Sequence, residues 1–204
     1  MNKHLLWLLC FLCFSAQAQT PKNKATQPNV ILIVADDLGY GDLSCYGEKT
    51  INTPAVDALA KQGLRFTNAH ATAATCTPSR YSLFTGLYNW RRPDTGIAPG
   101  DAAMVILPEQ TTIADVFKSA GYTTGAIGKW HLGMGGERGK QDWNGFITPG
   151  PSDIGFDYSC LMAATADRVP CVWIENQRVA NYDPSAPIEV SYGKPIEGEP
   201  TGKN

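Results

Sequence analysis

Apolar residues occur along the chain in short runs that have the lengths and compositions of β-strands. Residues 30–34 form a continuous aliphatic run, which is typical of a strand buried on both faces of a parallel sheet. Residues 64–71 and 123–130 have the pattern of two further short strands. Beyond about residue 134, glycine, proline and asparagine become dense, and only residues 171–176 resemble a strand.

The first of three predicted helices has a recognisable start and end. Thr53 is a favourable capping residue, and Pro54 suits the first helical position because its missing N–H is not needed there. Gly63 is expected to end this helix. The predicted apolar face of the helix consists of Val56, Leu59 and Ala60.

Two more helices are predicted between residue 78 and residue 121. Pro78 suits the first turn of the second helix, which runs through Tyr81 and Leu83 and ends at Gly86. The third helix combines a cap at Thr111 or Thr112, an inward face of Ile113, Val116 and Phe117, and an end at Gly121.

The predicted elements follow the order strand, helix, strand, helix, helix, strand. This order is typical of α/β proteins, in which helices connect the strands of one sheet. The sequence shows no internal repeat, and its 204 residues suit a single domain. We therefore predict one α/β domain.

The first residues have the composition of a secretory signal peptide. Lys3 and His4 precede the apolar run LLWLLCFLCF, and small residues follow up to Ala18. We expect residues 1–18 to be removed after Ala18 and residues 19–28 to form a polar leader. The chain is therefore predicted to be exported to the periplasm or secreted.

The composition also limits the classes of partner. The formal net charge of the chain is −2, and removal of the signal takes away one lysine, so the mature chain is weakly acidic. Such a charge does not indicate a nucleic-acid partner. The apolar run is too short to cross a bilayer as a helix, and no other stretch is long enough. We expect no nucleic-acid partner, and no membrane association after the signal is cleaved.

Four cysteines remain after the signal: Cys45, Cys76, Cys160 and Cys171. An oxidising compartment favours disulfides, and Cys160–Cys171 is the predicted pair if Cys76 is reserved for chemistry. The alternative is that the other three cysteines are all reduced and buried.

Asp36 and Asp37 follow the first predicted strand directly, and Gly39, Gly41 and Asp42 come next. The carboxyl edge of a parallel sheet is where α/β proteins keep their sites. Two adjacent carboxylates repel each other unless a cation neutralises them, and oxygen ligands suit Ca²⁺ or Mg²⁺. The alternative is a solvated loop with an aspartate as a helix cap.

Cys76 precedes Pro78 and Arg80 in the motif CTPSR. If a helix begins here, the backbone N–H groups and the arginine create a positive environment. That environment would lower the pKa of a thiol or hold an anion such as phosphate or sulfate. The alternative is a cysteine at a helix start with no function, beside a surface arginine.

The motif GKWHLG, residues 128–133, places Lys129 and His131 at the end of a predicted strand. Alternation along the strand would point both side chains to one side, with Trp130 on the other. A lysine can hold an anionic oxygen and a histidine can transfer a proton. The alternative is a turn with a surface lysine and a histidine bonded to the backbone. His70 is expected to form only local bonds.

The motifs ADDLGYGD, CTPSR and GKWHLG, in this order, resemble those of the sulfatase family, which belongs to the alkaline-phosphatase-like superfamily. The resemblance extends from about Asn29 to at least Tyr158. It implies an α/β sandwich with a mostly parallel central sheet flanked by helices. It also implies a hydrolase that cleaves sulfate monoesters of small molecules or carbohydrates.

The resemblance assigns a role to each candidate residue. Cys76 would be oxidised to formylglycine by a modifying enzyme that reads the motif around it, and the hydrated aldehyde would attack sulfur. Asp36, Asp37 and the modified Cys76 would bind Ca²⁺, with Mg²⁺ as a possible substitute. The remaining assignments are Arg80 to the diol, Lys129 to the sulfate, and His131 to the diol as the base of the elimination step.

The chain also departs from the family pattern. Sulfatases complete the metal site with a downstream Asp-Asn or Asp-Gln pair and add a second histidine and lysine, whereas no histidine follows His131 here. We therefore expect residues 29–204 to be an incomplete, N-terminal part of a sulfatase catalytic domain, without appreciable turnover on its own. The alternatives are a phosphomonoester or phosphonate hydrolase of the same superfamily and an inactive exported fragment.

Overall fold

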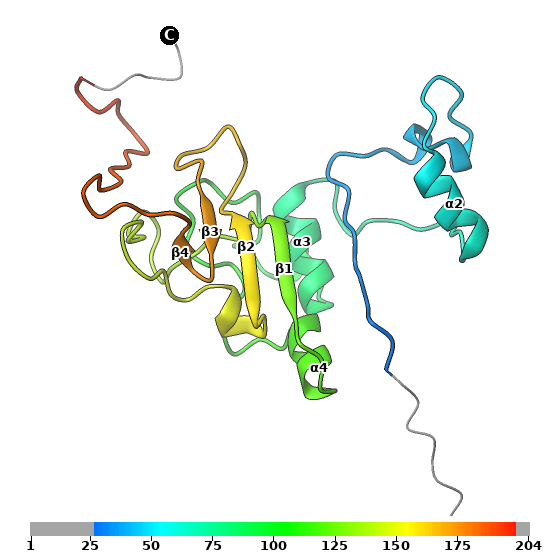
Figure 1. Cartoon of the computed structure of the whole chain (residues 1–204), viewed down its shortest axis with the longest axis horizontal. Helices are drawn as coiled ribbons and strands as arrows, with labels where there is room; N and C mark the ends of the chain where they lie inside the picture. Colours follow the sequence, from blue (N-terminus) through cyan, green and yellow to red (C-terminus); the bar gives the residue numbers. More distant parts are fainter. Residues whose placement is uncertain (1–26, 199–204) are drawn as a thin grey trace, which may run out of the picture.

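The computed structural model describes residues 27–198 (Figure 1). The predicted signal peptide over residues 1–18 and the leader up to residue 26 lie outside the described residues. The helices are α2 (Pro54–Gln62), α3 (Cys76–Thr85) and α4 (Ile113–Ser119), and the strands are β1 (Gly125–Lys129), β2 (Tyr158–Met162), β3 (Trp173–Glu175) and β4 (Arg178–Val179). Short 3-10 turns lie at Tyr40–Asp42, Ser44–Tyr46, Asn89–Arg91 and Pro151–Ile154.

The four strands form one open sheet in the order β1-β2-β3-β4. The β1–β2 pair is parallel, with Gly125 opposite Tyr158, and the two following pairs are antiparallel. Helices α3 and α4 lie beside β1, at one side of this sheet (Figure 1). The α/β class is therefore confirmed, and the sheet of the described residues is mixed rather than mostly parallel.

All three predicted helices are present, and local chemistry explains their ends. Helix α3 begins at Cys76, two residues before Pro78, and Gly86 ends it with a φ of 68° that a glycine adopts without steric cost. At α4, the side chain of Thr112 accepts a hydrogen bond from the backbone N–H of Asp115, whose carboxylate accepts one from the N–H of Thr112. This capping box fixes Thr112, rather than Thr111, as the cap.

Two predicted helix faces are only partly correct. In α4, Ile113 and Phe117 are half-buried, but Val116 is 57% exposed. In α2, Val56 and Leu59 are exposed although they form an apolar face, because no larger element packs against that face. The apolar pattern predicted the helices, but it did not predict which elements pack against their apolar faces.

The strand predictions for residues 30–34 and 64–71 are wrong for this structure. Neither segment is a strand, and Ile31 and Ile33 are 84% and 79% exposed. A strand needs a neighbour for its backbone hydrogen bonds, and residues 30–34 have none among the described residues. Instead, a cavity of about 420 Å³ separates Val30, Leu32 and Val34 from the open edge of β1. The predictions for residues 123–130 and 171–176 are confirmed by β1 and β3.

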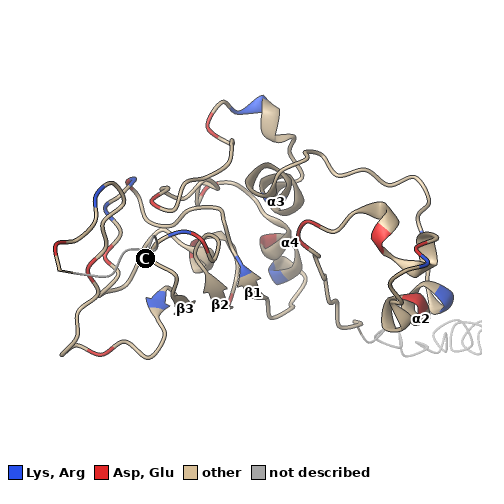
Figure 2. Ribbon diagram, turned by 90° about the horizontal axis from the view of Figure 1, so that it is seen from above, with Lys and Arg blue, Asp and Glu red and all other residues tan. Residues whose placement is uncertain are grey.

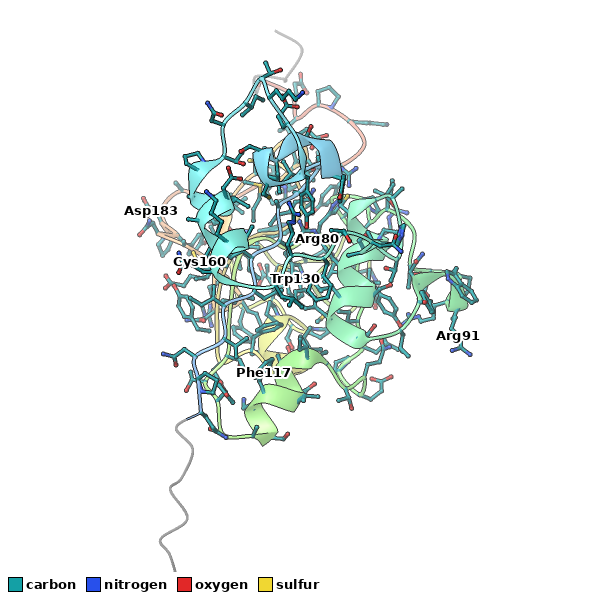
Figure 3. The ribbon with its side chains drawn as sticks, turned by 90° about the vertical axis from the view of Figure 1, so that its right-hand side faces the viewer. Arg80, Arg91, Phe117, Trp130, Cys160 and Asp183 are labelled. Carbon is teal, nitrogen blue, oxygen red and sulfur yellow. The ribbon has the colours of Figure 1, made fainter. Side chains whose placement is uncertain are left out.

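The core lies between the sheet, α3, α4 and the loops around them. Trp130, labelled in Figure 3, is 1% exposed. It stacks on Phe84, with a distance of 5.8 Å between ring centroids, and it meets the edge of Phe156 at 6.3 Å. Every buried residue of the described chain lies between residues 77 and 177. Residues 27–75 contribute none, and α2 lies apart from the sheet in Figure 1.

The predicted Cys160–Cys171 disulfide is absent, because all four described cysteines are free. Cys160 lies in β2 opposite Glu175, whereas Cys171 precedes β3 by two residues. Along the antiparallel register the two cysteines are four positions apart, roughly 13 Å at the rise of a strand, which is too far for a disulfide. The alternative of three buried thiols is also wrong, since Cys171 is exposed.

No helix in residues 27–198 is long and apolar enough to cross a membrane. Acidic and basic residues are interspersed along the ribbon, both near α2 and around the sheet (Figure 2).

Candidate active site

The carboxyl end of β1 and the first turns of α3 bring three of the predicted site residues into contact. Arg80 Nη2 lies 3.0 Å from Asp36 Oδ1, and Lys129 Nζ contacts Asp36 Oδ2. Arg80 also donates through Nη1 to the backbone oxygen of Lys129 at 2.7 Å. Segments that are far apart in the sequence therefore form one charged cluster of Asp36, Arg80 and Lys129 (Arg80 is labelled in Figure 3).

The charges of this cluster do not cancel. The hydrogen bond from Lys129, together with Arg80, lowers the pKa of the Asp36 carboxyl below its ordinary value although partial burial opposes this shift. Asp36 is therefore ionised, and one carboxylate faces two cations. Arg80 and Lys129 can therefore attract an anionic ligand, although a second carboxylate, Asp37, borders the adjoining cleft.

A cleft of about 800 Å³ lies next to the cluster. Its walls include Asp36, Asp37, Cys76 and Arg80, so four predicted residues from two distant segments border one space. Lys129 lines the neighbouring cavity of about 420 Å³, which Asp36 and Arg80 also border. Asp36 and Arg80 thus form the wall between the two cavities.

Cys76 occupies the first position of α3 and is half-buried. Its neighbour Thr77 is fully buried and joins this helix start to two other segments. Thr77 Oγ1 donates to the backbone oxygen of His131 at 2.9 Å and accepts from the N–H of Ala98 at 3.0 Å. Thr77 is a positioning residue that the sequence reasoning did not single out, although it is part of the CTPSR motif that marked the site.

The structure separates the side chains of Lys129 and His131, contrary to the prediction that they share one direction. Lys129 contacts Asp36, whereas His131 Nε2 lies 2.9 Å from the oxygen of Ala98 in the buried interior. His131 has a φ of 54°, in the left-handed region. Because β1 ends at Lys129 and the backbone then changes conformation, the alternation of a strand does not continue to His131.

His131 is 1% exposed, and its environment favours the neutral ring. Burial is the main cause that lowers the pKa of the His131 imidazole, and the positive charges of Arg168, Lys129 and Arg80 lower it further, against the opposing contact with Ala98. Its Nδ1 atom is buried without a hydrogen-bond partner in the described chain. His70 bonds locally, as predicted, at 2.8 Å from Asn68 Oδ1, although it does not lie in a strand.

Asp36 and Asp37 have the oxygen donors that a hard cation such as Ca²⁺ prefers, but the described residues offer too few such donors. Asp36 and Asp37 offer carboxylate oxygens at one wall of the cleft. Both oxygens of Asp36 already meet cations, and no group of three or more His, Cys, Asp or Glu residues within residues 27–198 could hold a metal ion. Ca²⁺ takes six to eight oxygen ligands, so these residues form only part of a metal site.

Comparison with known proteins supplies the context for this arrangement. A family model described as Sulfatase matches residues 28–170. The chain is 54% identical to an N-acetylgalactosamine-6-O-sulfatase of Bacteroides thetaiotaomicron, over 87% of this chain and 34% of that protein. It is 39% identical to human arylsulfatase A, over 81% of this chain and 30% of that protein. The chain thus spans about a third of the length of these relatives.

Two solved structures show the same similarity in three dimensions. One comes from work on the metabolism of multiple glycosaminoglycans by Bacteroides thetaiotaomicron. It is 54% identical, has a TM-score of 0.83, and aligns with 87% of this chain and 37% of its own. The other is a complex with its substrate D-glucosamine-2-N,6-O-disulfate. It is 31% identical, has a TM-score of 0.52, and aligns with 67% of this chain and 23% of its own.

Proposed function

This chain belongs to the sulfatase family, and we propose that it provides the nucleophile and the anion-binding half of a site that hydrolyses sulfate monoesters. The observation that supports the proposal is the cluster of Asp36, Arg80 and Lys129 beside Cys76 at the start of α3. The two cations of the cluster and the N-terminal end of a helix both favour a bound sulfate group.

In this proposal a modifying enzyme would convert Cys76 to formylglycine, and this group would supply the nucleophilic oxygen that displaces the alcohol from the sulfate ester. The residues of the chain have defined tasks around that group. Arg80 is held in place by Asp36 and by the backbone oxygen of Lys129, and it borders the same cleft as Cys76. Lys129 neutralises charge that builds on the sulfate oxygens, an effect that is strong in a partly desolvated site.

Asp36 and Asp37 would contribute carboxylate oxygens to a bound Ca²⁺ or Mg²⁺. Such an ion would polarise the sulfate and would relieve the repulsion between the adjacent carboxylates. The described residues supply only part of the ligands of such an ion.

We propose a sulfated carbohydrate, and more narrowly a sulfated amino sugar, as the substrate. The similarity to an N-acetylgalactosamine-6-O-sulfatase over 87% of the chain supports this class. We also propose that residues 1–18 direct export to the periplasm or beyond.

The test uses a chimera, because the chain spans only about a third of its relatives. Residues 28–204 would replace the matching part of the Bacteroides sulfatase, and the chimera would be co-expressed with a formylglycine-forming enzyme. We expect the peptide that contains Cys76 to carry the aldehyde by mass spectrometry, and the chimera to release sulfate from N-acetylgalactosamine 6-sulfate but no phosphate from an aryl phosphate.

Single substitutions in the chimera then test the assigned residues. Cys76→Ala should abolish turnover, and Lys129→Ala should lower kcat by roughly a hundredfold or more, as for the loss of one charge-stabilising donor. Lys140→Ala is the matched control, since Lys140 is exposed and, within residues 27–198, is paired only with Glu137. An unmodified Cys76, or equal turnover in the Lys129→Ala and Lys140→Ala chimeras, would contradict the proposal.

A further inference from the structure

Two stacked aromatic side chains are exposed in the turn that follows α3. Tyr88 and Trp90 are 52% and 70% exposed, and their rings stack with 5.4 Å between centroids and 24° between planes. A tryptophan is on average one of the more buried side chains of a protein. Two exposed rings in contact form a continuous apolar surface, which is a feature of interaction sites. The proposed function gives these rings no task.

A free cation directly follows the second ring. Arg91 is the last residue of the 3-10 turn Asn89–Arg91, is exposed, and makes no ion pair within residues 27–198. Figure 3 shows Arg91 at the outer edge of the molecule, away from the core. We call Tyr88, Trp90 and Arg91 the aromatic platform. It offers two ring faces and one guanidinium to solvent.

The backbone of the turn is held by side chains that do not belong to the platform. The hydroxyl of Thr95, which is 1% exposed, lies 2.5 Å from the backbone oxygen of Asn89 and 2.9 Å from that of Arg92. Arg92 Nη1 donates to Gln110 Oε1 at 3.0 Å, and its guanidinium lies over the ring of Tyr81 in α3. The platform is therefore preformed, which lowers the entropy lost when a ligand binds.

The chemistry of the platform matches a sugar ring that carries an anionic group. The flat face of a pyranose presents C–H groups, whose partial positive charge suits the negative face of an aromatic ring. The indole N–H of Trp90 and the hydroxyl of Tyr88 place polar groups at the ring edges, where they can bond to sugar hydroxyls. The guanidinium of Arg91 can bind a sulfate group through two parallel N–H donors.

The platform is separate from the cleft that Cys76 borders. None of its three residues lines that cleft. Helix α3 lies between the two places: Cys76 is its first residue and the platform follows its last residue, Thr85. The two ends of this helix are roughly 15 Å apart at the rise of an α-helix, which is further than a single sugar ring extends.

We propose that the aromatic platform is a second carbohydrate-binding site, which holds a sulfated glycan chain at a sugar other than the one that is hydrolysed. The platform favours a polymeric substrate over a monosaccharide, because only a chain of sugars contacts both places. The role in substrate selection rests on the proposed function, whereas the binding of the glycan itself does not.

The first experiment measures binding by the full, unmodified chain, because binding requires neither turnover nor formylglycine. The probe is a chondroitin 6-sulfate oligosaccharide with N-acetylgalactosamine 6-sulfate at its non-reducing end, titrated by calorimetry. We expect Trp90→Ala to raise the Kd roughly tenfold, as for the loss of one aromatic anchor. Trp173→Ala is the matched control, because Trp173 is half-exposed in β3, and it should leave the Kd unchanged. Equal Kd values for Trp90→Ala and the unsubstituted chain, or equal increases in both variants, would overturn the proposal.

A second variant separates the charge from the stacking. Arg91→Gln should raise the Kd about threefold, the scale of an exposed ion pair, and should leave the Kd for the unsulfated oligosaccharide unchanged. High salt should remove this effect by screening but not the effect of Trp90→Ala. Arg138→Gln is the control, since Arg138 is exposed and already pairs with Asp101. Equal changes for the sulfated and unsulfated probes would overturn the sulfate contact of Arg91.

The second experiment uses the sulfatase chimera to test the role in substrate selection. Trp90→Ala should raise KM for the oligosaccharide roughly tenfold, with kcat unchanged and KM for N-acetylgalactosamine 6-sulfate unchanged. Equal increases in KM for both substrates would overturn a separate site. A lowered unfolding temperature of the Trp90→Ala chimera would show that the rest of the sulfatase domain covers the turn, and would also overturn the proposal. A chimera without turnover would contradict the proposed function but would not alter the result of the binding experiment.

Discussion

Residues 27–75 bury no side chain, whereas residues 76–198 contain all of the buried core that the described chain has. The first region includes α2 and two 3-10 turns, which are held by short-range hydrogen bonds such as those from Ser44 to Thr53 and Asp57. The second region packs its elements around Trp130 and its aromatic neighbours. Local hydrogen bonds can form an element, but only burial of apolar surface gives it substantial stability.

The candidate site lies on the border between the two regions. Asp36 comes from the exposed region, while Arg80 and Lys129 come from the packed region. Gln27 makes a further connection by donating to the backbone oxygen of Ala120 at 2.9 Å. The part of the site that belongs to the packed region is thus joined to the part in the exposed region by a few polar contacts.

Truncation of a core aromatic should have the largest effect. Trp130→Ala removes a ring that is 1% exposed and stacked on Phe84, and we expect it to lower the free energy of unfolding by about 3–5 kcal/mol. Leu59→Ala in α2 removes a side chain that is 64% exposed, and should cost less than about 0.5 kcal/mol. Urea unfolding followed by circular dichroism measures both. Similar losses would show that the two regions are equally packed.

Substitutions at the helix caps should show the same contrast between the two regions, with smaller changes in the free energy of unfolding. Thr112→Ala removes the hydroxyl that caps α4 and that also donates to the oxygen of Ile154 at 2.7 Å, so we expect a loss of about 1–2 kcal/mol. Thr53 precedes α2 but makes no side-chain hydrogen bond to the backbone of that helix. Thr53→Ala should therefore change the unfolding free energy of the core by at most a few tenths of a kcal/mol. The same urea titration measures the loss of unfolding free energy in both variants. A loss for Thr53→Ala as large as that for Thr112→Ala would contradict the absence of a capping hydrogen bond from Thr53.

The ion pairs of Asp36 should matter locally rather than globally. In metal-free buffer, Asp36→Asn weakens the contacts to Arg80 and Lys129, so amide hydrogen exchange in residues 29–38 should accelerate several-fold. The urea midpoint of the core should stay unchanged. Asp37→Asn is the matched control, because Asp37 makes no ion pair in the described chain. Equal acceleration in both variants would mean that Asp36 does not anchor this segment.

A depressed carboxyl pKa gives the smallest predicted effect, which appears only in acid. The ion pair with Lys118, supported by the N–H and hydroxyl of Thr124, lowers the pKa of Asp157 from 3.8 to about 2. Its contribution is therefore present above pH 3.8 and is lost as the pH falls toward about 2. Asp157→Asn should flatten the decline of the core's urea midpoint in that range.

The control for this pH effect lies in the other region. Asp57 also has a lowered carboxyl pKa, caused mainly by the hydroxyl of Ser44, but it stabilises only the unit around α2. Asp57→Asn should leave the pH dependence of the core unchanged. A change as large as that of Asp157→Asn would show that the α2 unit unfolds together with the core.

The sequence predicted those features that depend on a few neighbouring residues. Proline, threonine and glycine positions defined all three helices, because caps and left-handed ends are formed within one turn of the backbone. The three motifs also identified Asp36, Arg80 and Lys129, which the structure brings into one cluster. The strand β2 was not predicted, since its five residues lie within a glycine- and proline-rich stretch that masks the pattern.

Only the tertiary structure decided which apolar patterns are buried and where buried side chains point. The run at residues 30–34 has a clear strand composition but no partner in the described chain, because backbone pairing depends on a second segment that the run itself does not specify. The direction of the His131 side chain depends on the left-handed backbone conformation of His131 itself. It also depends on Ala98 and Arg168, which lie 33 and 37 residues away in the sequence. Local sequence fixes the ends of helices and the residues available for chemistry, whereas burial and side-chain direction come from contacts between distant segments.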